Sequence, residues 1–223
     1  MELPIGAETS LAAYDALPAR MPRFAVPRRT SDGLLGETLT LHTIQTSDAW
    51  RELAATGVLL PDLNRAEAHF HAAYAWMDRQ MSARGLVGEG MHWLWGRIPR
   101  KALHHSARLS PGSVLLTVRV PRGRVLLSDF ADWHFVLNDA PFVAVRDGES
   151  VEEWESRSDA VEAAGRAIVE RTWEAIFDPD MWQEGGDLQA TIREIRASDV
   201  VRATRIRPRP FRRADSTNDK RLL

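Results

Sequence analysis

The chain has 223 residues, of which 44% are hydrophobic and 27% are charged, a balance that is ordinary for a globular protein with one substantial domain. A net charge of −2 provides no global basic field, so we expect neither general nucleic-acid binding nor a membrane partner. The absence of cysteine excludes disulfides, thiol nucleophiles and cysteine-based metal sites. Because the first residues lack the pattern of a secretory signal, we expect a cytoplasmic protein of bacterial type.

The two ends of the chain differ in composition from the middle. Residues 1–37 are rich in proline, alanine and arginine, which is typical of a poorly ordered leader. Residues 208–223 contain two prolines followed by a polar run, and we expect them to form a solvated tail. The sequence therefore predicts a single folded domain over residues 38–207.

The first half of this domain shows clear strand and helix patterns. Residues 38–44 alternate between apolar and β-branched positions and predict a strand. A helix follows, with Ser47 as its N-cap and Gly57 at its end. Residues 58–60 form a short strand, and residues 65–82 carry an apolar stripe that predicts a long amphipathic helix.

The second half contains more strands, a second long helix and a closing pair of strands. The expected elements are an aromatic stretch at 91–98, strands at 113–120 and 124–127, a turn or short helix at 129–137, a helix at 158–177, and strands at 188–195 and 200–206 joined as a hairpin. Strands and helices do not alternate regularly, so we expect an α+β domain with a mixed, mainly antiparallel, partly closed sheet flanked by two long helices.

The densest polar segment follows the strand at 124–127. It reads Asp-Phe-Ala-Asp-Trp-His-Phe-Val-Leu-Asn over residues 129–138. Buried polar groups need partners, so this density indicates either a functional site or a hydrogen-bonded structural corner. As a site, Asp132 would orient His134 as a general base and Asn138 would fix a substrate. As a corner, Asp129 would cap a short helix whose apolar residues pack inward.

Several short strings stand in a distinctive order between residues 39 and 207. They are Leu-His-Thr-Ile-Gln at 41–45, Ala-Tyr-Ala-Trp-Met at 73–77, Trp-Leu-Trp at 93–95, the polar segment at 129–138, Ile-Phe at 176–177 and Gln-Ala-Thr-Ile at 189–192. Together they resemble a bacterial family known as domain of unknown function 3841. The Asp-Phe-x-x-Trp-His-x-x-Leu-Asn string is the most specific of them, and the family brings no established activity.

The opening and closing strands carry a second pattern. His42 and Thr43 lie in the first strand, ahead of a helix that ends at a glycine, and Gln189 enters the closing pair. This arrangement distantly resembles ADP-ribosyltransferases, in which a first-strand His or Arg binds the nicotinamide ribose and a later Glu stabilises the oxocarbenium-like transition state. The resemblance implies that NAD is a substrate and that His42 and Gln189 meet in one cleft. Gln189 stands where that pattern has Glu. A neutral amide can orient a ribose hydroxyl, but it carries no negative charge to stabilise the positive charge of the transition state.

Other side chains complete this predicted nucleotide site. Trp93 and Trp95 would share one side of a strand and flank a ring, or else they line the core. Arg97 would bind a phosphate with two parallel hydrogen bonds, or else it is one of many exposed arginines in this chain. Histidines at 69 and 71 would point to different sides of their helix, and we expect no metal.

Three functions follow from these patterns. The leading hypothesis is an ADP-ribosyltransferase-like protein that binds NAD or a related nucleotide, its acceptor being unknown. The alternative is a non-catalytic binding or interaction module of a phage-related or toxin-linked locus, and a hydrolase lacking an evident nucleophile ranks third. The candidate catalytic residues are His42, Gln189, Asp132 and His134, and the candidate ligand-binding residues are Thr43, Trp93, Trp95, Arg97 and Asn138.

Overall fold

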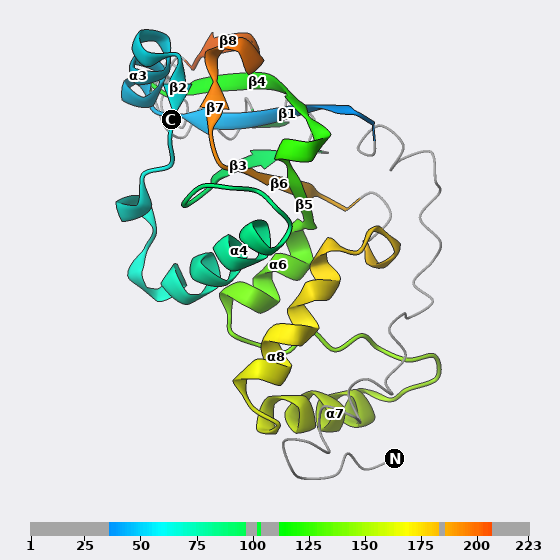
Figure 1. Ribbon diagram of the computed structural model, residues 1–223. Helices are drawn as coiled ribbons and strands as arrows, with labels where there is room; N and C mark the ends of the chain where they lie inside the picture. Colours follow the sequence, from blue (N-terminus) through cyan, green and yellow to red (C-terminus); the bar gives the residue numbers. More distant parts are fainter. Residues whose placement is uncertain (1–35, 97–101, 104–111, 183–185, 207–223) are drawn as a thin grey trace, which may run out of the picture.

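A computed structural model describes residues 36–96, 102–103, 112–182 and 186–206, so the predicted leader and tail lie almost wholly outside the described residues (Figure 1). Its main element is a six-stranded antiparallel sheet in the order β5-β6-β3-β1-β4-β8. The strands are β1 (Thr38–Gln45), β3 (His92–Trp95), β4 (Val114–Pro121), β5 (Leu126–Asp129), β6 (Leu188–Ile192) and β8 (Val200–Arg205). The α+β class is confirmed. The sheet is open and not partly closed, because β5 and β8 form its two edges and do not pair with each other.

The remaining elements surround this sheet. The α-helices are α3 (Ser47–Thr56), α4 (His71–Ala83), α6 (Phe130–Leu137), α7 (Val151–Ala163) and α8 (Arg166–Thr172). Two short strands, β2 (Val58–Leu59) and β7 (Ile195–Arg196), form a second sheet. Single 3-10 turns occupy Leu63–Arg65, Ala68–Phe70, Arg122–Arg124, Trp173–Phe177, Pro179–Met181 and Ala197–Asp199. None of the helices in the described part of the chain is long and apolar enough to cross a membrane.

Helix α3 begins one residue earlier than the sequence predicts. The N-cap is Thr46, whose hydroxyl accepts a hydrogen bond of 3.1 Å from the backbone of Ala49, whereas Ser47 already lies inside the helix. The predicted end at Gly57 is confirmed. Gly57 has φ of +81°, and its N–H donates to the carbonyl of Leu53 in the left-handed conformation that glycine adopts without strain.

The long helix predicted at 158–177 is wrong as a single element. It is divided at Gly165, whose φ and ψ of +99° and 167° belong to a region that essentially only glycine adopts. The first part, α7, starts earlier than predicted because Ser150 and Glu153 form a reciprocal capping box. The second part continues from α8 into a 3-10 turn, so its apolar stripe stays in the core although the helix axis changes.

The predicted hairpin between the last two strands is also wrong. After β6 the chain enters β7, which pairs with β2 of the second sheet and carries the chain to the opposite edge of the main sheet. There β8 pairs with β4, whereas β6 lies between β3 and β5. The closing strand pair on which the ADP-ribosyltransferase resemblance partly rested is therefore not formed.

The two faces of the main sheet have different coverings. On one face, Leu53 of α3, Leu59 of β2 and Ile195 of β7 pack against alternate residues of the strands. On the other face, α4 and α6 lie next to the β3, β5 and β6 part of the sheet, with α8 and then α7 farther from it (Figure 1). This second core contains no residue of β1, β4 or β8. On the other half of this face, Leu103 packs against Leu115 and Ile206 in a third, smaller cluster, with Ile44 and Trp95 beside them.

Candidate functional site

One residue from each strand of the main sheet lines up in a single row across the face that bears the helices. In an antiparallel sheet, directly paired residues project to the same side, so the register identifies the members of the row. His42 pairs with Trp95 on one side and with Thr117 on the other. In order from β5 to β8, the cross-strand row is Ser128, Gln189, Trp95, His42, Thr117 and Arg202.

Two neighbours in this row are buried polar groups without partners. Ser128 is 1% exposed and Gln189 is 4% exposed, and they pair directly across β5 and β6. Neither the Ser128 hydroxyl nor the Gln189 side-chain nitrogen has a hydrogen-bond partner. A buried donor left unpaired costs about 1–3 kcal/mol, so two of them side by side mark a position where atoms from outside the chain would be favourable.

A pair of aromatic rings lies over Gln189. Phe130 continues the pairing of β5, since its N–H donates to the carbonyl of Asp187 at 3.0 Å. Trp95 comes from β3, on the other side of β6, and the two ring centroids are only 4.7 Å apart. Because β6 runs between the strands that carry them, the rings meet above the buried amide. Both residues are partly exposed, so this pair separates the polar groups from solvent.

His42 shares the row with Gln189 but does not adjoin it. The strand that carries Trp95 lies between them, which separates their Cα atoms by about 10 Å, or two strand spacings. The Nδ1 atom of His42 is 3.1 Å from the hydroxyl of Thr117, its direct neighbour on β4. The structure therefore places the two predicted catalytic residues on the same face, with an aromatic side chain between them.

Thr43 and Trp93 lie away from this row. Thr43 alternates to the opposite face, where its buried hydroxyl donates to the carbonyl of Trp93 at 3.0 Å and accepts from Gln45 at 2.9 Å. Trp93 is on the same face as Trp95 but packs into the helical core, with its ring centroid 4.9 Å from that of Trp133. Of Thr43, Trp93 and Trp95, only Trp95 joins His42 and Gln189 in the row.

The polar segment at 129–138 forms helix α6, and its polar groups bond mainly to the helix itself. The buried carboxylate of Asp129 accepts from the backbone of Asp132 at 3.0 Å and caps the first turn. His134 Nδ1 contacts the carbonyl of Phe130 at 2.9 Å, and the Asn138 amide donates to the carbonyl of His134 at 2.8 Å. Asp132 is buried and His134 is exposed. Residues two apart on a helix do not face each other, so these two do not form an Asp–His pair.

His134 nevertheless lies at the rim of the row. Its ring packs edge-on against Phe130 with centroids 4.9 Å apart, next to the Trp95 ring. Since Nδ1 faces a carbonyl, it carries the proton in the neutral ring, and Nε2 is left as a hydrogen-bond acceptor. Asn138, at the far end of α6, does not reach this rim. Arg97 lies outside the described residues.

Several other polar clusters are fully engaged in holding the fold. Arg193 uses Nε and both terminal nitrogens to bond Leu86, Asp78, Gly90 and Ser82, which ties β6 to α4 and the loop that follows it. No group of three or more His, Cys, Asp or Glu residues suited to a metal ion occurs in the described ranges.

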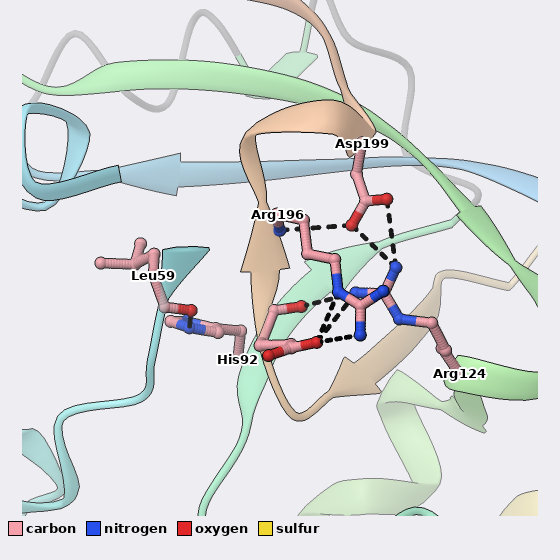
Figure 2. A network of polar contacts seen from close by, with 6 residues as sticks. Leu59, His92, Arg124, Arg196 and Asp199 are labelled. Atoms are coloured by element: carbon pink, nitrogen blue, oxygen red, sulfur yellow. Dashed lines mark hydrogen bonds and ion pairs between the residues drawn. The ribbon is translucent and has the colours of Figure 1, made fainter. Parts of the chain in front are cut away.

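A second network joins the chain around β5, β7 and β8 (Figure 2). Arg124 binds both carboxylate oxygens of Asp199, at 3.1 and 2.9 Å, and Asp199 also accepts from the backbone of Arg196 at 3.2 Å. Nearby, the buried ring of His92 contacts the carbonyl of Leu59 at 3.0 Å and links the two sheets. Burial lowers the pKa of His92, so the ring stays neutral at pH 7.

The sequence patterns did not single out Ser128, Thr117 or Arg202. Ser128 stands directly before the recognised string at 129–138, but its place in the row depends on pairing with Gln189, sixty-one positions later. Thr117 and Arg119 are the two polar residues that interrupt the apolar run of β4, and that interruption was a signal available in the sequence.

A family model described as domain of unknown function (DUF3841) matches residues 40–201, well over half of the chain. The matched range contains the whole cross-strand row except Arg202. No curated protein and no solved structure matches the chain, so these comparisons give the ADP-ribosyltransferase resemblance no support. The chain belongs to the family of unknown function DUF3841.

Proposed function

We propose that this domain binds a nucleotide-like small molecule at the cross-strand row, with NAD as the first ligand to test. The observation that carries the proposal is the pair of buried, unpartnered polar groups on Ser128 and Gln189. The Gln189 nitrogen donates only, and the Ser128 hydroxyl can donate or accept. A carboxamide or a ribose hydroxyl offers the matching groups, and Trp95 provides a planar surface for a ring beside them.

Access to these groups requires the Trp95 and Phe130 rings to separate. The ring pair is partly exposed and is joined at its rim by the exposed His134. A planar ligand that enters between the two rings contacts both of them, and this limits the free energy needed to separate them. His134 Nε2 would then accept a hydrogen bond from a ligand hydroxyl.

Binding does not by itself imply transfer of ADP-ribose. Transfer from NAD develops positive charge at the anomeric carbon, and a carboxylate is the group that stabilises it. The row contains no carboxylate, since Gln189 stands at the matching position. Asp187 is exposed and lies two residues before Gln189 along the chain, which makes it the carboxylate to test. Release of nicotinamide by wild-type protein, and its loss in Asp187→Asn, would extend the function from binding to catalysis.

Calorimetric titration with NAD tests the binding proposal. Gln189→Met keeps the volume of the side chain and removes the amide, and we expect it to weaken binding at least tenfold. The matched control is Gln80→Met on α4, whose side chain bonds to Arg84, the residue that follows the same helix. Equal affinity of wild type and Gln189→Met for NAD would contradict the proposal, as would the absence of binding to wild type.

A non-catalytic interaction module is the second candidate. It is favoured by the local bonding of Asp129, His134 and Asn138, which makes the most recognisable string of the family a capped helix. This function predicts that no nucleotide stabilises the wild-type protein in a thermal-shift panel. Stabilisation by any nucleotide at a concentration well above its dissociation constant would count against it.

A further inference from the structure

Two exposed arginines lie on the same face as the cross-strand row, at its β8 end. Arg202 is the last member of the row and pairs with Thr117. Arg119 is two residues further along β4 and pairs with Thr40 on β1. Both therefore project to the face that bears His42 and Gln189. As diagonal neighbours on adjacent strands, their Cα atoms are about 7–8 Å apart.

These arginines have no counter-charge among the described residues. Neither makes a hydrogen bond or an ion pair with any residue in the described ranges, whereas most other arginines of the fold are engaged. Continuing the register of β4 and β8 brings Asp199 opposite Arg119, yet both oxygens of Asp199 are bound by Arg124 (Figure 2). This carboxylate is thus committed elsewhere, and the two exposed arginines remain as adjacent like charges.

The neighbours of the pair add hydrogen-bond donors and no negative charge. Thr40, which is exposed, faces Arg119 across the β1–β4 ladder. Thr117 faces Arg202 but is buried, and its hydroxyl contacts His42. On the other side of Thr117 stands His42. Arginine guanidinium groups beside hydroxyl groups form the donor set that binds phosphate oxygens.

From this geometry we propose that Arg119 and Arg202 bind a phosphate group of the ligand whose ring occupies the Trp95 end of the row. The inference rests on the proposed function and narrows the ligand class from nucleotide-like molecules to those that carry phosphate. The row runs for about 19 Å between the Cα atoms of Gln189 and Arg202, or four strand spacings. A ring at Trp95 with a phosphate chain directed toward β8 follows the row, with His42 in the middle beside the ribose.

The test compares four probes by calorimetry: nicotinamide riboside, nicotinamide mononucleotide, NAD and inorganic pyrophosphate. We expect the mononucleotide to bind at least tenfold more tightly than the riboside, and the difference to shrink as salt is raised. The double variant Arg119→Gln, Arg202→Gln should lose most of this preference, about five- to tenfold for each arginine, while its affinity for the riboside is unchanged.

Arg205→Gln is the matched control. Arg205 is exposed on the same strand as Arg202, but its partner is Val114, so it projects to the opposite face. A loss of phosphate preference in Arg205→Gln equal to that in the double variant would overturn the inference, because it would indicate a general effect of net charge. Equal binding of riboside and mononucleotide to wild type would also overturn it.

The probes separate this inference from the function on which it rests. If riboside binds and depends on Gln189 but phosphate adds nothing, the proposed function stands and the arginine site fails. If pyrophosphate alone binds, and the double variant abolishes its binding, the arginine site stands and the nicotinamide ligand is wrong. Failure of all four probes would overturn both.

Discussion

The unpartnered polar groups of Ser128 and Gln189 lead us to predict that removing them raises the free energy of unfolding. Ser128→Ala and Gln189→Leu each remove a buried polar group that has no partner and replace it by an apolar one. We therefore expect each substitution to stabilise the ligand-free protein, whereas most core substitutions destabilise. The gain should be about 1–3 kcal/mol for each, the cost of an unpaired buried polar group.

Urea unfolding followed by far-ultraviolet circular dichroism measures this gain. The midpoint should rise while the slope with denaturant stays the same, because the surface exposed on unfolding hardly changes. In thermal unfolding, a gain of 1 kcal/mol corresponds to a rise in Tm of about 2–4 °C for a chain of this size. Any stabilisation that a nucleotide confers on wild type should shrink in the same variants.

Thr172→Val provides the matched control. Thr172 is equally buried, at 1% exposed, but its hydroxyl donates to Val169 at 2.7 Å and accepts from the backbone of Phe142 at 2.9 Å. Valine has nearly the same shape, so the loss of these two bonds should destabilise by about 1–3 kcal/mol. If Ser128→Ala and Gln189→Leu destabilise as much as Thr172→Val does, the polar pair is satisfied in solution and the reasoning about the site is refuted.

Two further predictions concern the networks that hold the fold. Arg193→Lys should lower the free energy of unfolding in urea by about 2–4 kcal/mol, because three ammonium donors cannot replace the five bonds of the guanidinium. A loss below about 0.5 kcal/mol, which is the size expected for a surface substitution, would contradict this. Glu149 accepts from Arg157 at 2.5 and 2.7 Å, and this contact lowers the pKa of its carboxyl from 4.5 to about 2. Its contribution to stability should be complete above pH 4.5 and be lost as the pH falls toward 2. Glu149→Gln should therefore lower the stability above pH 4.5 and flatten the stability profile between pH 4.5 and 2.

The individual strands and helices could largely be predicted from the sequence, but which strands pair with each other could not. The alternating pattern at 38–44 predicted β1, and the glycine at 57 predicted the end of α3, since both signals act within a few residues. The position of β6 depends on pairing with β3 and β5, which are far away in sequence. No local pattern specifies such a partner, so the hairpin with β8 was the simplest expectation and was wrong.

The candidate site divides in the same way. Alternation along β3 correctly placed Trp93 and Trp95 on one side, but only the helical layer decides that Trp93 is core and Trp95 is not. The composition of the segment at 129–138 made it recognisable. The structure shows that its Asp129 caps helix α6, which is a structural role. Ser128 belongs to the candidate site because it pairs with Gln189, and the sequence alone does not identify that pairing.

The strand order also has a consequence for how the protein forms. His92 on β3 pairs with Ile192 on β6, one hundred positions later, and among the described strands β6 alone connects β5 to the rest of the sheet. During synthesis β5 therefore has no paired strand until the chain is nearly complete. Pairing β3 with β6 closes a loop of about one hundred residues, and its entropic cost precedes the contacts that offset it. A ribosome-bound chain that stops before residue 188 has β1, β3 and β4 but cannot join the two ends of the row, so binding at this face can appear only once the last strands have emerged.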